Sequence, residues 1–500
     1  MKKFIAFILA WMLSTTSLLA YEGEMGYFGG TTTGYKLPTT TEQASTKRNT
    51  QKITLPYKET LYLTGKPVVV TGTIQFKPNE VDKAKGSGSY SESYVIKAED
   101  ASGDNKVTRT VTLDTRYLYD GVARQMTKTS EVKKWTEVVV IDGNTYQLDS
   151  KLSSFSKSIL EDYTPGATYY RGDVNYEAVY KDITGGEDTL KVQVNGPIYG
   201  YEHNFAKTET QKRSITIDNG GTQYYMEEMP TYTVYKELQY GANEPDAISF
   251  AGNYKEIIRG EGSNTYNVIA GHPSLYDDEQ VASYNVVDAP KIEQLSAIEL
   301  SKLKGHPAEA DIKKMYSMKI FTEDVKNFSP DKVVTRGEYI KMLVKALNME
   351  VPQLEEKKST KKKDDKEEVI IFTDLSKTNP YYPYAMAAYN AGLVGAGSFG
   401  ASTPLTREEM IMWNVKAVGL ERLGLGTGQI GTAYIDDAKI ATWAKPSVYA
   451  AAKLGIAPEA NNYFLPKRQV TYSEAAAVLT QYLDYLRYEL QKDYNDKMMP

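Results

Sequence analysis

The clearest chemical signal in this 500-residue sequence is a cation at the first position of two predicted helices. The tetrad Thr-x-x-Glu begins at Thr335, Thr406 and Thr471, each time seven residues after a phenylalanine. The tetrad predicts a capping box, in which Thr and Glu accept each other's backbone amide hydrogen bonds. Arg336 and Arg407 follow the first two threonines, where a cation opposes the positive end of the helix dipole. We therefore predict that a carboxylate or phosphate is bound there by the guanidinium and the helix amides together.

The tetrads belong to a threefold internal repeat, with threonines 71 and 65 residues apart. Repeats of this length predict stacked supersecondary units that share a core. The capping glutamates are Glu338, Glu409 and Glu474.

A second helix pattern precedes each tetrad. It spans 382–393 in the second repeat and 443–456 in the third, and it is looser in the first. Gly392 and Gly455 are predicted to end two of these helices in the left-handed conformation. The motifs Phe372-Thr373-Asp374 and Tyr434-Ile435-Asp436 come before the second and third patterns.

These elements, in this order, resemble the S-layer homology (SLH) domain, whose pattern is roughly F-x-D, W-A, a helix ending in Gly-Ile or Gly-Leu, F-x-P and T-R-x-E. The resemblance covers three tandem copies at 296–349, 370–425 and 432–490. It implies an all-α pseudo-trimer of helical repeats. By resemblance, the grooves between repeats bind pyruvylated secondary cell-wall polysaccharide non-covalently and hold exported proteins to the surface of Gram-positive-type bacteria.

The resemblance also implies which residues contact the polysaccharide. The arginines would meet the ketal carboxylate, and the other positions are the motif aspartates, the stacking tryptophan and a tyrosine that replaces it: Arg336, Arg407, Asp374, Asp436, Trp443 and Tyr382. The first repeat lacks F-x-D and has Pro307 in place of Trp, and the third has Tyr472 in place of Arg, with Lys467 or Arg468 as an alternative charge. We therefore expect at most two working grooves.

The amino-terminal half shows a different pattern, typical of strands. Short β-branched or aromatic segments lie at 53–57, 107–113, 135–141 and 214–217. Asp142-Gly143 predicts a tight hairpin. Residues 52–289 are therefore predicted to be all-β, as an antiparallel sandwich or an extended sheet, with 83–93 as a mobile loop.

Tyrosine is unusually frequent, with 40 residues against 12 phenylalanines. On a strand the ring packs on its cross-strand neighbours while the hydroxyl stays in water, so a Tyr-rich sheet can keep one face solvated. The alternative is that exposed rings stack on carbohydrate or contact a protein.

The remaining segments read as an export signal and linkers. Residues 1–20 have the layout of a secretory signal peptide, with cleavage expected after Ala20; the alternative is an uncleaved anchor. Residues 21–51 are predicted to be a flexible lead-in, and 350–369, with the charged run 355–368, a linker. No later run is long enough to predict a second membrane span.

Composition narrows the function. The chain has no cysteine and only three histidines, which excludes thiolate chemistry and gives no metal-ligand spacing. A net charge of −5 argues against a nucleic-acid partner. No cofactor motif occurs, and adjacent carboxylates such as Glu227-Glu228 and Asp277-Asp278 point to opposite faces of a strand.

We therefore predict a secreted, non-enzymatic protein of the cell wall and cell surface. Its partners would be the wall polysaccharide and other surface-layer subunits, and its β region would be structural or adhesive. The alternatives are a wall-anchored enzyme acting on polysaccharide and a carbohydrate-binding module.

Overall fold

The computed structural model describes residues 23–34, 37–40, 42, 52–79, 81–185, 189–241, 253–269, 280–298, 300–352, 370–424, 431–457 and 461–494. The predicted signal peptide, 1–20, and the charged run, 355–368, lie outside these residues.

The described strands form one antiparallel sheet of sixteen strands. They are β1 Thr31–Thr32, β2 Ile53–Leu61, β3 Val68–Phe76, β4 Ser87–Glu99, β5 Lys106–Asp120, β6 Gln125–Ile141, β7 Asn144–Leu148, β8 Ser154–Tyr163, β9 Ala167–Asp182, β10 Thr189–His203, β11 Ala206–Gln211, β12 Arg213–Asn219, β13 Thr222–Gly241, β14 Asn253–Ile269, β15 Gln280–Val287 and β16 Lys291–Ser296. Neighbours in sequence are mostly neighbours in the sheet.

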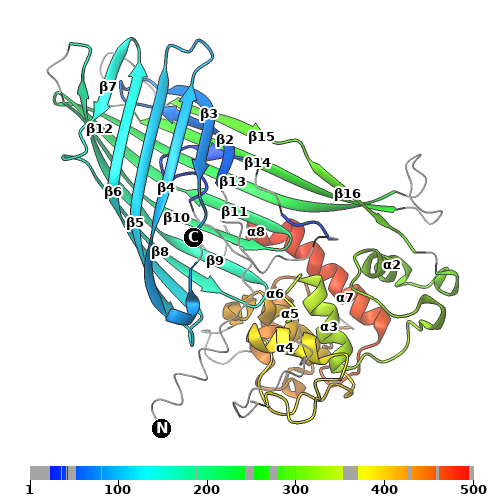
Figure 1. Ribbon diagram of the computed structural model, residues 1–500. Coiled ribbons are helices and arrows are strands. Elements are labelled where there is room, and N and C mark those ends of the chain that lie inside the picture. The colour runs from blue at the N-terminus through cyan, green and yellow to red at the C-terminus, as the bar shows by residue number, and fades with distance from the viewer. Residues whose placement is uncertain are drawn as a thin grey trace, which may run out of the picture.

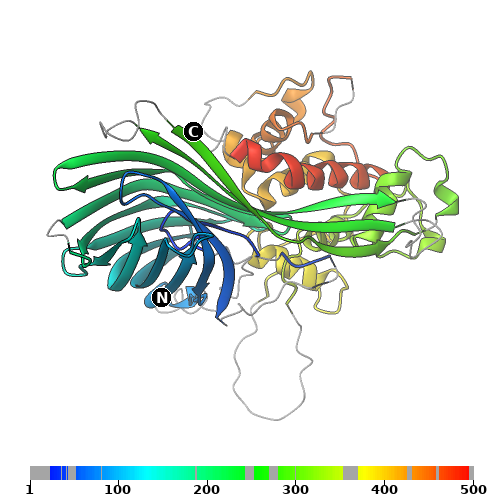
Figure 2. The ribbon, with the colours of Figure 1, turned by 90° about the horizontal axis from the view of Figure 1, so that it is seen from above.

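The sheet is strongly curved (Figure 2). Along its strands, side chains alternate between the two faces. Along β5 every second residue, from Val107 to Tyr119, is buried on the inner face. The two ends of the strand order approach each other: Tyr284 Oη in β15 donates a hydrogen bond to the Lys58 carbonyl in β2 (3.2 Å). The all-β prediction for this half is confirmed, and the architecture is a single curled sheet.

Local predictions in the sheet have mixed outcomes. The hairpin at Asp142-Gly143 is confirmed: both residues have positive φ, and Ile141 pairs with Asn144. The predicted loop at 83–93 is wrong, since 83–85 form a 3-10 turn and 87–93 begin β4. The small residues of β4 leave room for neighbouring rings, as where Tyr117 lies against Gly88.

Part of the predicted flexible lead-in is buried inside the sheet. Residues 23–33 are buried, and Phe28 packs against Trp135 and Phe155 (ring centroids 5.5 and 5.8 Å). Gly30 passes so close to the Tyr57 ring that a Cβ atom would overlap it. The Gly-rich composition, which suggests disorder, therefore allows the backbone to pass close to neighbouring side chains.

The inner face also holds buried ion pairs. Arg109 donates to Glu59 (2.9 Å) and Glu137 (2.7 Å), and Lys207 pairs with Glu24 of the amino-terminal segment. Buried charges of this kind are tolerated only when they are paired.

Many tyrosines of the sheet are buried, and several of their hydroxyls are bonded within the protein. Tyr57 Oη donates to Glu59 (2.9 Å) and Tyr94 Oη to Glu92 (2.8 Å), each two residues away on the same face of its strand. For these residues the expectation of solvated hydroxyls is wrong, because the inner face supplies buried carboxylate acceptors.

The helices gather at one end of the sheet (Figure 1). They are α2 Glu309–Ser317, α3 Arg336–Ala346, α4 Tyr382–Asn390, α5 Arg407–Ala417, α6 Lys445–Lys453, α7 Tyr472–Asp484 and α8 Leu490–Asp493, with a π-helical turn at Tyr485–Glu489 between the last two. Gly392 and Gly455 have positive φ after α4 and α6, as predicted.

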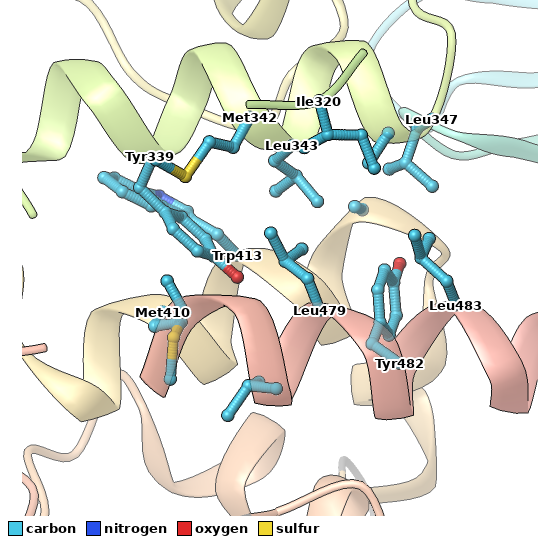
Figure 3. Close-up of a cluster of buried hydrophobic side chains, with 14 of the residues drawn as sticks. Ile320, Tyr339, Met342, Leu343, Leu347, Met410, Trp413, Leu479, Tyr482 and Leu483 are labelled. Atoms are coloured by element: carbon cyan, nitrogen blue, oxygen red, sulfur yellow. The ribbon is translucent and has the colours of Figure 1, made fainter. Parts of the chain in front are cut away.

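The three helices that start at the tetrads, α3, α5 and α7, form the centre of the helical region. Their facing side chains, among them Leu343, Trp413 and Leu479, make a common core (Figure 3). Tyr339 stacks on Trp413 and donates to Asn414 Oδ1 (2.8 Å).

The carboxyl-terminal ends of these helices contact the sheet. The Ala417 carbonyl, at the end of α5, accepts the Gly166 amide (2.6 Å), and the Asn204 side chain reaches the Ala346 carbonyl at the end of α3 (3.5 Å). Tyr494, beyond α8, donates to the Gly200 carbonyl (3.0 Å). Sheet residues such as Tyr201 belong to the same hydrophobic cluster as the helices, so the two halves share a core.

Candidate ligand-binding surface between the repeats

A capping box starts each of α3, α5 and α7, as predicted. The amides of Thr335, Thr406 and Thr471 each donate to the side chain of the glutamate three residues later, at 2.8, 3.0 and 3.1 Å. These pairs are structural, because they satisfy amides that the first helical turn leaves open.

The residues just before the capping threonines join the repeats in a closed ring. The Val334 amide donates to Val470 (2.8 Å), Val470 to Leu405 (3.0 Å), and Leu405 to Val334 (2.9 Å). All three side chains are fully buried. These three bonds arrange the repeats cyclically.

The first helix amides are occupied by protein. Arg336 and Gly337 donate to the carbonyls of Thr403 and Ala401 in the next repeat (both 2.9 Å). The corresponding amides of α5 and α7 donate in the same way to the carbonyls of Arg468, Pro466, Lys332 and Pro330. The prediction that these amides help to bind an external anion is therefore wrong, because the neighbouring repeat already takes them.

The anion that Arg336 meets in the structure is a protein carboxylate. Arg336 forms an ion pair with Glu409, the capping glutamate of the next repeat, and lies over the Trp413 and Phe399 rings (5.3 and 5.7 Å). This contact explains a cation at the start of α3 without an external ligand.

Arg407 occupies the corresponding place between the second and third repeats. It is only 5% exposed and lies 5.7 Å from the Phe464 ring centroid. Burial lowers the pKa of Arg407, whereas the Glu474 carboxylate acts in the opposite direction. A desolvated guanidinium of this kind gains from any further anion that reaches it.

The motif aspartates hold a loop of their own repeat. Asp374 accepts the amides of Phe399 and Gly400 (both 2.7 Å), and these bonds, that of Phe399 first, lower the pKa of Asp374. Asp436 is buried and accepts the amides of Phe464 and Leu465 (2.8 and 2.9 Å). Both carboxylates therefore position the segment that faces the arginine.

The two predicted aromatic residues are not equivalent. Counting back from the left-handed residues Gly392 and Gly455, Trp443 corresponds to Pro380, and Tyr382 corresponds to Lys445. Tyr382 is buried against Phe372 (6.2 Å), whereas Trp443 is 53% exposed. The structure therefore does not give Tyr382 the place of an exposed stacking residue.

At the junction of the second and third repeats, charged and aromatic side chains lie together. Lys467, with 63% of its side chain exposed, pairs with Glu408, next to Arg407. The other Glu408 oxygen accepts the amide of Ala441 (3.0 Å), two residues before Trp443. Glu408, the residue after Arg407, therefore joins the segment of Lys467 to the segment that leads into Trp443.

Aromatic side chains pack at the other two junctions. Tyr472, at the position of the arginines, is 1% exposed and packs edge-on against Phe321 and Phe328 (both 5.4 Å). The ring of Tyr381 lies against Gly337 at the start of α3, and a Cβ atom there would be 2.8 Å from it.

Sequence reasoning considered Lys467 only as a substitute charge and did not find Glu408 or Glu409 as partners. The signal for Glu408 was its position beside the arginine. The ion pair between Lys467 and Glu408 joins two repeats and residues 59 positions apart, so no local sequence pattern indicates it.

A hydrolase site in the sheet would need a pair of carboxylates that substrate can reach. Glu59 and Glu137 flank Arg109, but their side chains are 4% and 1% exposed and share its guanidinium. Glu228 is buried while Glu227 is exposed, as expected for adjacent strand residues. In the described residues these carboxylates serve buried ion pairing.

A family model described as "S-layer homology domain" matches residues 303–340, 371–411 and 434–476. Each match contains one capping tetrad and falls within one of the three predicted copies. The resemblance stated from the sequence is thus confirmed: the helical half carries three tandem domains of this kind, which anchor proteins to the cell wall. No helix among the described residues combines the length and apolar character needed to cross a membrane.

Three relatives share part of the chain. An amylopullulanase of Thermoanaerobacterium thermosulfurigenes is 32% identical over 161 residues, 30% of this chain and 8% of the relative. The exoglucanase XynX of Acetivibrio thermocellus is 34% identical over 161 residues, 30% of this chain and 13% of the relative. An endoglucanase of Bacillus sp. (strain KSM-635) is 29% identical over 177 residues, 34% of this chain and 17% of the relative. The chain therefore spans less than a fifth of the length of each of these relatives.

Proposed function

We propose, from the premise that this chain carries three tandem S-layer homology domains, that it is an exported protein held non-covalently to a pyruvylated secondary cell-wall polysaccharide. Its β region has a structural or adhesive role at the cell surface. The wall polymer, and other subunits of a surface layer, are its partners.

The observation that carries this proposal is the junction of the second and third repeats. A pyruvyl ketal offers a carboxylate on a sugar ring, which suits a buried guanidinium beside an exposed indole. Arg407 and Trp443 supply these two groups, Lys467 adds a second cation, and Asp436 positions the Phe464 loop that faces Arg407. We propose this junction as the main binding groove, and Arg336 with Asp374 as a weaker one.

The direction of the helices supports a role at the surface. The starts of α3, α5 and α7 carry the motif, while their ends contact the sheet. A protein bound to the wall through the motif end would project its sheet away from the wall.

The test uses the full chain, because the helical half shares its core with the sheet. The protein is incubated with purified cell walls before and after chemical removal of pyruvyl groups, and bound protein is measured against concentration. We expect Arg407→Ala to weaken binding by at least ~30-fold, since removing one partner of a desolvated charge contact costs ~2–5 kcal/mol. Lys133→Ala, an exposed change on the sheet, is the matched control.

Two results would overturn the proposal. One is equal binding to walls with and without pyruvyl groups. The other is an unchanged wall affinity for an Arg407→Ala protein that has the same unfolding midpoint as the parent.

An enzymatic role is the alternative, and it is favoured only by the names of the three relatives. They share about a third of this chain. Release of reducing sugar from starch, glucan or wall polysaccharide by the purified protein would establish it.

A further inference from the structure

Four buried lysines lie on described strands of the sheet, and one of them differs from the rest. Lys128 and Lys157 have a carboxylate oxygen at 2.6 and 3.1 Å, and Lys207 forms an equally direct pair with Glu24. Lys236 is fully buried, but the nearest carboxylate oxygen among the described residues, on Glu256, is 3.9 Å away. Its Nζ lies 3.4 Å from the side-chain oxygen of Asn204.

The backbone holds this lysine and this asparagine together. Lys236 is in β13, and Asn204 is in the turn between β10 and β11. The Lys236 amide donates to the carbonyl of Phe205, the residue after Asn204 (2.9 Å). The side chain of Asn204 is further fixed by its contact with the Ala346 carbonyl. The amine and the amide therefore meet in a defined geometry.

The surroundings make this amine easier to deprotonate than that of an exposed lysine. The Lys236 Nζ is 5.8 Å from the Phe205 ring, and the buried Arg487 guanidinium is 4.6 Å from the same ring. The pKa of Lys236 is lowered to about 8, chiefly by burial; Glu256 opposes this shift and Arg487 contributes to it. A desolvated lysine of this kind is a nucleophile near neutral pH.

Glu256 lies beside the Lys236 amine. Its two oxygens accept the amide and the hydroxyl of Thr40 (2.8 and 2.9 Å), which fixes the carboxylate beside Lys236. It is buried, and its Oε1 is the atom 3.9 Å from the Lys236 Nζ.

We propose that Lys236 and Asn204 react to form an intramolecular amide bond, with Glu256 as the proton carrier. The Nζ lone pair attacks Cγ of Asn204, the bond from Cγ to Nδ2 breaks, and ammonia leaves. Glu256 takes a proton from Nζ and delivers it to the departing nitrogen, so that no oxidant or other reactant is needed. The bond would join the β10–β11 turn to β13 in a chain that has no cysteine for a disulfide.

Mass spectrometry of the folded full chain tests the bond directly. We expect an intact mass lower than the sequence by about 17 Da, the mass of the ammonia lost in amide formation. Trypsin cannot cleave after an acylated lysine, so a branched peptide joining 192–207 to 214–255 is expected. Succinimides at Asn195-Gly196 or Asn219-Gly220 would lose the same mass but leave the two peptides separate.

Variants separate the chemistry from folding. Three variants should each have the full mass and lack the branched peptide: Asn204→Ala, Lys236→Arg and Glu256→Gln. Lys255→Arg, on the neighbouring strand, should keep both the mass loss and the branched peptide. The parent chain alone can overturn the proposal: a full intact mass, with 192–207 and 214–236 recovered as separate peptides, excludes the bond. A branched peptide in Glu256→Gln would overturn the role of Glu256.

Discussion

Arg336, the first residue of α3, forms an ion pair with Glu409, the capping glutamate of the next repeat. The arginine thus joins two repeats, and the glutamate both starts its own helix and receives its neighbour's charge. In the third repeat Tyr472 replaces the arginine, and the capping glutamate Glu338 is instead paired with Lys332 (2.8 Å).

Loss of the Arg336 contact should weaken the junction between the first two repeats. We expect Arg336→Ala to lower the free energy of unfolding by ~1 kcal/mol, because the guanidinium is 26% exposed and part of its attraction is screened by water. Urea denaturation measures this. Lys332→Ala, whose side chain is 58% exposed, should change stability less, and an equal loss in both variants would contradict the expectation.

The amino-terminal segment should be essential for stability. Phe28→Ala removes a ring that is 3% exposed and packs on Trp135, Phe155 and Tyr176, so we expect a loss of ~3–5 kcal/mol. Leu152→Ala, at an exposed position, should change stability by less than ~0.5 kcal/mol. A Phe28→Ala protein with the parent's urea midpoint would show that the segment adds nothing to the core.

A buried glutamate gives the fold a pH dependence. Burial raises the pKa of Glu209 to about 7, while bonds from the Gly23 amide (2.8 Å) and Tyr170 (2.9 Å) oppose the shift, as does Lys207; Glu24 adds to it. Between the unfolded pKa of about 4.5 and about 7 the folded state holds a proton that the unfolded state has lost. Stability from this group therefore falls as pH rises through that window.

Glu209→Gln removes this titration and keeps an acceptor oxygen. We expect the variant to match the parent at pH 5 and to exceed it at pH 8 by up to ~3 kcal/mol, measured by urea unfolding at both pH values. The same difference from the parent at both values would exclude Glu209 as the titrating group.

The sheet and the helical repeats should unfold together. Trp135 reports on the sheet and Trp413 on the helical core, so each is followed in a protein whose other three tryptophans are replaced by Phe. Coincident fluorescence transitions are expected because the halves share a hydrophobic cluster. Tyr494→Ala, which removes a ring stacked on Tyr169 and bonded to Gly200, should separate the two transitions. Two transitions in the parent chain would contradict a shared core.

Short-range patterns in the sequence predicted well. The capping boxes at Thr335, Thr406 and Thr471 and the Asp142-Gly143 hairpin are confirmed, because each depends on residues within one turn of one another. The three repeats were found from the same local spacing.

Contacts between distant segments were not predictable in this way. The glycine-rich segment around Gly30 suggests disorder from its composition, but in the fold Gly30 lies against the Tyr57 ring. The same segment is buried by contacts such as that of Phe28 with Trp135, more than a hundred positions away. The helix amides that suggest an open anion site are occupied by a neighbouring repeat, such as Arg336 by Thr403. The binding roles of Arg407, Asp436 and Trp443 stay predictions, which the wall-binding measurements address.

The ring of Val334, Leu405 and Val470 has a consequence for how this anchor can change over time. Open arrays of repeats grow or shrink at their ends, because each unit touches only the units before and after it. Here every repeat gives one amide to a neighbour and one carbonyl to the other, so the ring has no end at which a unit can be added. Deletion of a single repeat would leave one amide and one carbonyl of this ring without their partners.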